Sequence, residues 1–263
     1  MKKYVPIARA SYMVGLVYRF GFLFTILGNI IYLGVAYYLW KSIYKYSNTL
    51  RGLTFDEAFL YVALGSAIFV LLKTYADWII HYEIREGMIA VYLTKPMDFQ
   101  LYALAANFGS LLMGLTAVSI PTIVILIFVF KVKVALGVGL LLFPVSLLLA
   151  FLISFSIDYF VGVMAFYSES VWGLSITKEI IVTVFSGALI PLQFFPDAIR
   201  NILFWLPFQA IYHTPIMMIT KADQGLNIFL PMLLVQCLWA VTLFMFTRLF
   251  YNQAIKVLRI AGG

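Results

Sequence analysis

Three charged side chains inside apolar segments are the first candidates for chemistry. Lys73 and Asp77 lie four residues apart in the stretch 58–80, and Asp158 lies near the end of another apolar run. A lysine or aspartate at the centre of a membrane helix costs roughly 2.5–3.5 kcal/mol on insertion scales. Because residues four apart share a helix face, we expect Lys73 and Asp77 to pair. A structural position at the membrane edge is the preferred interpretation for all three residues, and a substrate or proton role is the alternative.

The common catalytic motifs are missing from the sequence. It contains no G-x-x-x-x-G-K-[ST] loop, no H-E-x-x-H pair and no G-x-S-x-G elbow. His81 and His213 are far apart, and the single cysteine, Cys237, forms neither an intrachain disulfide nor a thiolate metal cluster. We therefore expect no catalytic residue, no metal site and no cofactor on this chain. The few intramembrane charges also argue against a proton-coupled transporter, which carries Asp, Glu or His through its spans.

The composition indicates a membrane protein. Of its 263 residues, 64% are hydrophobic and 11% are charged, whereas soluble domains contain about 45–50% apolar and about 25% charged residues. The net charge of +7 indicates basic cytoplasmic segments rather than nucleic-acid binding. We predict an all-α polytopic membrane protein with one domain over residues 1–263. Its six transmembrane helices are expected at approximately 20–40, 58–80, 101–130, 136–164, 178–195 and 227–247.

The segment 196–219 is apolar but is interrupted by prolines. Pro196, Pro207 and Pro215 punctuate it, and Arg200 and His213 lie inside it. An internal proline removes a helical hydrogen bond, and broken backbone at membrane depth persists only when protein or a cavity surrounds it. We predict two short helices that enter and leave one membrane face, in preference to a seventh span.

The two tails predict the orientation. The N-terminal tail, 1–19, carries four basic residues and no acidic one, and the C-terminal tail, 248–263, carries three basic residues and no acidic one. Basic segments remain in the cytoplasm, so both tails are expected inside, which requires an even number of spans. The basic, aromatic N-terminal segment is expected to form either an interfacial helix or a simple flank to the first span.

The polar stretch "HYEIREGMIAVYLTKPMDFQ", residues 81–100, separates the second and third predicted spans. The pattern predicts a short helix, a joint at Gly87, and a second helix that ends before Pro96. Four apolar residues are expected to share one face of the second helix: Met88, Ile89, Tyr92 and Leu93. We predict that this amphipathic segment docks onto another protein, and the alternative is a solvated connector on the membrane.

Two regions resemble ABC-2 type permeases, the bacterial six-span membrane subunits of ABC exporters without a fused ATPase. They are "IREGMIAVYLTKPMDFQLYALA", residues 84–105, and "GALIPLQFFPDAIRNILFWLPFQAIYHTPI", residues 187–216. The resemblance covers essentially the whole chain. It implies an interfacial N-terminal helix, six spans with both termini cytoplasmic, and a location in the bacterial cytoplasmic (inner) membrane. It also implies a cytoplasmic coupling helix between spans 2 and 3 and short re-entrant helices between spans 5 and 6.

The resemblance assigns roles to two sets of residues. Those implied to couple the chain to an ATPase are Glu83, Arg85, Glu86, Gly87, Met88, Tyr92 and Lys95. Those implied to lie in the external re-entrant helices are Pro196, Arg200, Trp205 and Pro207.

The resemblance also implies partners. An ABC ATPase subunit would bind ATP and Mg²⁺, and a second permease subunit would complete a homodimer or heterodimer surrounded by lipid. The expected activity is export of a hydrophobic or amphiphilic substrate, and no nucleic acid is expected. A passive channel and a non-transporting scaffold or regulatory subunit are the alternatives, although the spans lack the polar rings of a channel.

Overall fold

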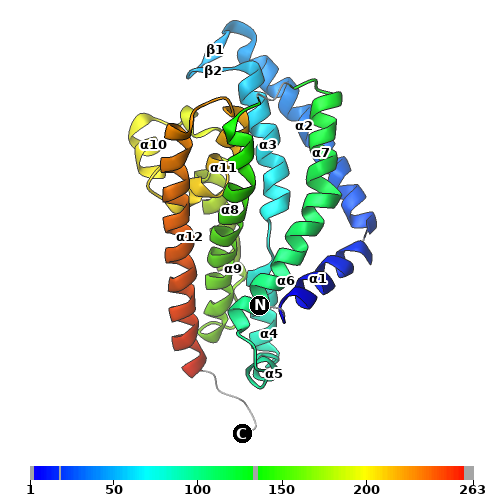
Figure 1. The fold of residues 1–263 in the computed structure, drawn as a ribbon, viewed down its shortest axis with the longest axis vertical. Helices are drawn as coiled ribbons and strands as arrows, with labels where there is room; N and C mark the ends of the chain where they lie inside the picture. The colour runs from blue at the N-terminus through cyan, green and yellow to red at the C-terminus, as the bar shows by residue number, and fades with distance from the viewer. Residues whose placement is uncertain (1–2, 18, 133–135, 258–263) are drawn as a thin grey trace.

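The computed structural model describes residues 3–17, 19–132 and 136–257 as a bundle of long helices (Figure 1). Its α-helices are α1 (Val5–Val17), α2 (Arg19–Ile43), α3 (Phe55–Leu72), α4 (Ala76–Arg85), α5 (Ile89–Leu93), α6 (Phe99–Gly114), α7 (Ile120–Phe128), α8 (Val138–Val163), α9 (Trp172–Phe185), α10 (Asp197–Leu203), α11 (His213–Thr220) and α12 (Leu226–Ala254). The shorter elements are the antiparallel strands β1 (Thr49–Leu50) and β2 (Leu53–Thr54), the π-helical turn η2 (Leu115–Ser119), and the 3₁₀ turns η1 (Tyr44–Tyr46), η3 (Met164–Phe166), η4 (Leu192–Phe194), η5 (Pro207–Ala210) and η6 (Ile255–Val257).

Five helical stretches among the described residues are long and apolar enough to cross a membrane. They are Phe20–Tyr46, Phe55–Arg85, Phe99–Phe128, Val138–Phe166 and Leu226–Val257. These stretches correspond to five of the six predicted spans, and η2 joins α6 to α7 within the third. The chain is therefore an all-α polytopic membrane protein.

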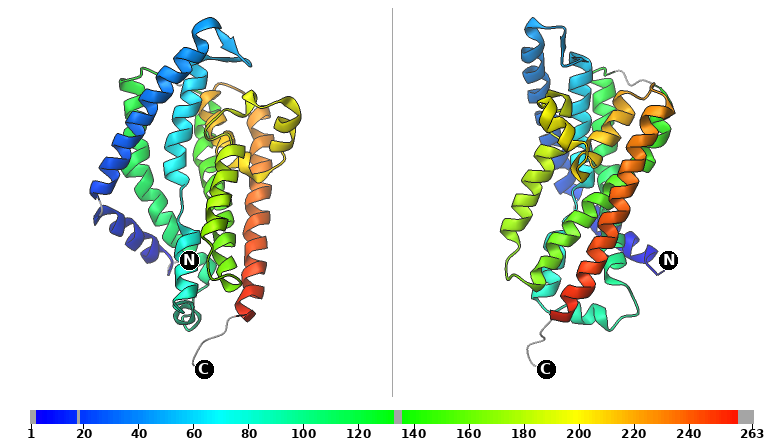
Figure 2. Two further views of the ribbon diagram at one scale, coloured as in Figure 1. Left: turned by 180° about the vertical axis from the view of Figure 1, so that it is seen from behind. Right: turned by 90° about the vertical axis from the view of Figure 1, so that its left-hand side faces the viewer.

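The predicted fifth span, 178–195, is not one of these five. Its helix, α9, begins at Trp172, ends at Phe185 and has 14 residues, which gives it a length of about 21 Å. The helix ends early because Gly187 adopts a φ of +82° and Pro191 follows. α9 still connects the two ends of the bundle, because α8 ends near α4 and α5 whereas α10 lies toward the opposite end (Figures 1 and 2).

The N-terminal segment forms a separate apolar helix, α1, inclined to the long helices and packed against α6 (Figure 1). Gly109 permits this close approach, because a Cβ atom there would lie 2.2 Å from the carbonyl oxygen of Ala8. The predicted N-terminal helix is thus confirmed, and its interfacial location stays a prediction. Residues 1–2 and 258–263 of the basic tails lie outside the described residues.

The segment 196–219 forms the short helices α10 and α11, with η5 between them, rather than one continuous helix. α11 is buried against α3 and α8, and Tyr61 of α3 hydrogen-bonds Nδ1 of His213 at 2.8 Å. The prediction of short helices is confirmed. Their entry into a membrane face stays a prediction.

A buried amide ties this segment to the bundle. Gln236 of α12 is fully buried. Its Nε2 donates to the carbonyl oxygens of Ser146 at 2.9 Å and Ala210 at 2.8 Å, and its Oε1 accepts from the Ser146 hydroxyl at 2.9 Å. One side chain thus joins α12, α8 and η5.

We predict that Gln236→Leu lowers the free energy of unfolding by about 1–3 kcal/mol, because it leaves buried carbonyl and hydroxyl groups without partners. Thermal unfolding in detergent measures the change. The matched control is Gln253→Leu on the exposed side of the same helix, which should leave the melting temperature nearly unchanged. Equal melting temperatures for the two variants would contradict a structural role for the Gln236 network.

Candidate functional site

The second span is broken where its charges occur. α3 ends at Leu72 and α4 begins at Ala76. Two contacts close the end of α3: the Lys73 N–H donates to the Phe69 carbonyl at 3.0 Å, and the Ser154 hydroxyl of α8 donates to the Leu72 carbonyl at 3.3 Å. Irregular backbone inside a membrane protein requires such hydrogen-bond partners for its polar groups. The break therefore depends on packing against α8.

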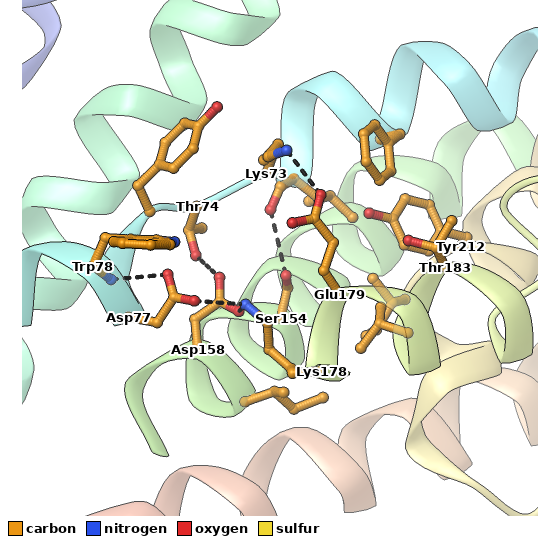
Figure 3. A pocket seen from close by; sticks show the side chains of 16 residues that line it. Lys73, Thr74, Asp77, Trp78, Ser154, Asp158, Lys178, Glu179, Thr183 and Tyr212 are labelled. Atoms are coloured by element: carbon orange, nitrogen blue, oxygen red, sulfur yellow. Dashed lines mark hydrogen bonds and ion pairs between the residues drawn. The ribbon is translucent and has the colours of Figure 1, made fainter. Parts of the chain in front are cut away.

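Lys178 of α9 bridges two carboxylates beside this break (Figure 3). Its Nζ lies 3.0 Å from Asp77 of α4 and 2.5 Å from Asp158 of α8. The Thr74 hydroxyl donates a further hydrogen bond to Asp158, and Asp77 accepts from the Trp78 N–H at 2.9 Å. The side chains of Asp77 and Asp158 are 3% and 9% exposed and that of Lys178 is 16% exposed, so the network is largely shielded from solvent.

A second ion pair borders the first. Lys73 Nζ lies 2.8 Å from Glu179, and these side chains are 34% and 42% exposed. The predicted pairing of Lys73 with Asp77 is therefore wrong. The pairing required continuous helix between the two residues, but Lys73 lies in the non-helical break at 73–75 and only Asp77 lies on α4.

The three predicted intramembrane charges thus lie in two adjoining ion-pair groups, whose other members the sequence did not single out. Lys178, Glu179 and Thr74 were missed. The adjacent pair Lys178–Glu179, at the start of an apolar run, could have indicated these contacts. Its charges are opposite to those of Asp77 and Lys73, respectively. An open pocket surrounds the network and is also lined by aromatic rings: Phe69, Tyr75, Trp78 and Tyr212.

The arrangement can bind a charged group or lock the helices together through charge. No group of three or more His, Cys, Asp or Glu residues suited to a metal occurs in the described ranges 3–17, 19–132 and 136–257. Each carboxylate of the network already contacts an ammonium group. The network joins α4, α8 and α9 across the break, so any movement of α4 must rearrange it.

The predicted docking segment lies at the other end of α4. Gly87 has a φ of +71°, which reverses the chain between α4 and α5. The Tyr92 hydroxyl donates to Glu83 at 2.9 Å and lies 3.0 Å from the Tyr102 hydroxyl of α6. Burial, together with the hydrogen bonds to Tyr102 and Glu83, raises the pKa of Tyr92, so the hydroxyl remains a donor. The predicted helix–joint–helix pattern is confirmed.

The exposed side of this segment mixes apolar and charged groups. Arg85, Glu86 and Lys95 are exposed beside Met88, and the Lys95 ammonium lies 5.0 Å from the ring centroid of Tyr92. The expected single apolar face is wrong, because Ile89 is buried and Tyr92 is half-buried. The apolar side chains left outward on the segment, here called the α5 tip, are Met88, Val91 and Leu93, which are 47%, 44% and 48% exposed.

The base of α5 is anchored to two distant parts of the chain. Asp98 caps α6 by accepting from the Leu101 N–H at 3.0 Å and pairs with Arg248 of α12 at 2.6 Å. The N-terminal segment adds Lys3, whose Nζ donates to the Pro96 carbonyl at 2.5 Å, and Tyr4, whose hydroxyl accepts from the Asp98 N–H at 3.1 Å. The tip is therefore held in a defined position.

The predicted external residues lie toward the end of the bundle opposite α5 (Figure 1). Pro196 is exposed before α10, and Arg200 pairs with Asp197 at 3.0 Å. Trp205 is 80% exposed, and Pro207 begins η5. These side chains surround short helices without converging on one site.

The family comparison agrees with this layout. A family model described as ABC-2 family transporter protein matches residues 30–262. The chain belongs to the ABC-2 transporter family. It is a multi-pass membrane component of that family, because the described residues include five helical stretches long and apolar enough to cross a membrane. A search among curated proteins found no match.

We predict that Lys178→Met destabilises this ABC-2 family protein by about 3–5 kcal/mol, because two buried carboxylates lose their shared cation. Adding Asp77→Asn and Asp158→Asn should restore most of the loss. Lys73→Met is the control, since its partly exposed pair should contribute less than about 1 kcal/mol. Chemical unfolding of the purified variants measures these differences, and equal effects of Lys178→Met and Lys73→Met would refute the bridging role.

Proposed function

We propose that this chain is the permease subunit of an ATP-driven exporter whose ATPase is a separate protein. The observation that carries the proposal is the α5 tip, an exposed apolar surface at one end of a membrane bundle. Charged residues beside it would define the register of docking, and the apolar side chains would supply the buried area. In this proposal ATP and Mg²⁺ bind to the partner ATPase and not to this chain.

The proposed topology has six crossings with both termini in the cytoplasm of a bacterium, at the cytoplasmic (inner) membrane. α9 and the turn and bend residues that follow it make the fifth crossing. The path of α9 supports this, because the C-terminal end of α8 and the short helix α10 lie toward opposite ends of the bundle (Figures 1 and 2). The α5 segment is then the cytoplasmic coupling helix, and α10, η5 and α11 form re-entrant helices on the external side. α1 lies along the inner leaflet.

α4 is the proposed lever between ATP hydrolysis and the membrane. Glu83 and Tyr92 fix the α5 tip to one end of α4, and Asp77 at its other end belongs to the ionic network. ATP-driven closure of the ATPase would displace the tip and shift the permease toward a state with different access. A second permease subunit, identical or related, would complete the pathway for a hydrophobic or amphiphilic substrate.

Affinity purification from the native membrane tests the partnership. We predict that a soluble ATPase co-purifies and that Val91→Glu in the α5 tip abolishes its association, because a carboxylate would be buried against the partner. The control is Tyr46→Glu, at an 88% exposed position toward the opposite end of the bundle. An ATPase-free eluate containing folded wild-type chain would favour a scaffold or a channel instead.

Gly87→Pro tests the lever. Proline fixes φ near −65°, so it cannot adopt the φ of +71° at this joint, and we predict that transport is uncoupled from ATP hydrolysis in vesicles while the chain remains inserted. Gly52→Pro, at another glycine with positive φ in the β1–β2 turn, is the control and should retain coupling. Retained coupling in both variants would contradict the assignment of α5.

A further inference from the structure

Lys73 occupies a cage suited to an ammonium group. Its Nζ lies 2.8 Å from Glu179, 5.5 Å from the ring centroid of Phe69 and 5.6 Å from that of Tyr75. A carboxylate together with aromatic faces within about 6 Å is the arrangement by which proteins bind ligand ammonium groups. Lys73 is partly exposed on a flexible stem. Its ammonium can therefore leave the cage at small cost, unlike that of Lys178, which two carboxylates hold.

The charge of the surrounding pocket favours a cation. Three carboxylates (Asp77, Asp158 and Glu179) and two ammonium groups (Lys73 and Lys178) line it. When all are ionised, the sum of +2 and −3 is −1. An anionic head group would add to this excess, whereas a ligand ammonium that replaces Lys73 at Glu179 would preserve the local pairing.

Apolar pockets continue from this cage along α3. Phe69 and Thr183 line both the charged pocket and a neighbouring apolar pocket between α2, α3 and the end of α9. That apolar pocket has small residues in its wall, which are Gly28, Gly65, Ser66 and Ala188. Tyr32 and Leu189 in turn border a third pocket, lined by Val35 and Trp40. The lining of these pockets changes along the row from charged to apolar. This order matches the charged head and apolar tail of an amphiphile.

We propose that this row of pockets binds a cationic amphiphile. Its amine replaces the Lys73 ammonium between Glu179, Phe69 and Tyr75, and its alkyl chain extends beside α3 past Gly28. The role of this ligand as the exported substrate rests on the proposed function, whereas its binding does not. Because Lys73 lies at the helix break, its displacement would link binding of the ligand to the position of α4.

Equilibrium dialysis tests the head-group site with the purified full chain in dodecyl maltoside micelles, with empty micelles as the blank. The probes are radiolabelled dodecylamine, dodecyl sulfate and dodecanol, which share one chain length, so competition by the detergent tail affects all three alike. We expect saturable binding of dodecylamine only. Glu179→Gln should weaken it about tenfold, and Lys73→Met should tighten it about threefold because the internal competitor is gone. The two variants remove opposite partners of one ion pair and should change the affinity in opposite directions. A general loss of folding cannot produce both changes.

A second pair of variants tests the tail. A Cβ atom added at Gly28 or Gly21 meets no atom within 4 Å. The two glycines lie seven residues apart on α2, but only Gly28 lines the pocket. Gly28→Leu should weaken dodecylamine binding at least fivefold, and Gly21→Leu should leave it unchanged. Three results would each overturn the proposal: equal binding of dodecyl sulfate, no effect of Glu179→Gln, or equal effects of the two leucine variants. The assay needs no ATPase, so its failure is distinct from failure of the permease assignment.

Discussion

A charged network at the break in the second span determines how this bundle is assembled. Lys178 bridges Asp77 and Asp158, and without this cation two carboxylates would be buried unpaired, at high cost. The network lies where α3 stops and α4 starts, and it draws in α8 and α9. α9 has little other contact with the bundle, and Ser175 is its only fully buried residue among those described. Ionic contacts, more than apolar packing, therefore position this helix.

The same break makes α4 a separate helix with different contacts at each end. One end carries Asp77 in the network, and the other continues through Gly87 to the exposed α5 tip. The Tyr92 hydroxyl links α5 to Glu83 of α4 and to Tyr102 of α6. The ion pair between Asp98 and Arg248 then ties the start of α6 to α12. In the proposed mechanism, a force applied at α5 would reach a polar pocket inside the bundle. An unbroken second span would transmit it along the whole of α3 instead.

The sequence predicted the parts of this structure that depend on local pattern. Hydropathy located five long helices, prolines indicated the short helices near α10 and α11, and Gly87 marked the joint before α5. The errors came from contacts between distant segments. The spacing of Lys73 and Asp77 predicts a pair only in continuous helix, and the partners they actually have, Glu179 and Lys178, lie about 100 residues away. The apolar face of α5 divides because Ile89 and Tyr92 pack inward on neighbouring helices.

Direct contact between the α5 tip and an ATPase is central to the proposed function. The most direct measurement is photocrosslinking in native membranes from benzoylphenylalanine placed at Leu93, followed by mass spectrometry of the adduct. The account predicts an adduct with a soluble protein whose peptides include a G-x-x-x-x-G-K-[ST] phosphate-binding loop. The same label at Trp205, toward the opposite end of the bundle, should give no such adduct. Adducts at Leu93 with lipid alone, or with no nucleotide-binding protein, would contradict the account.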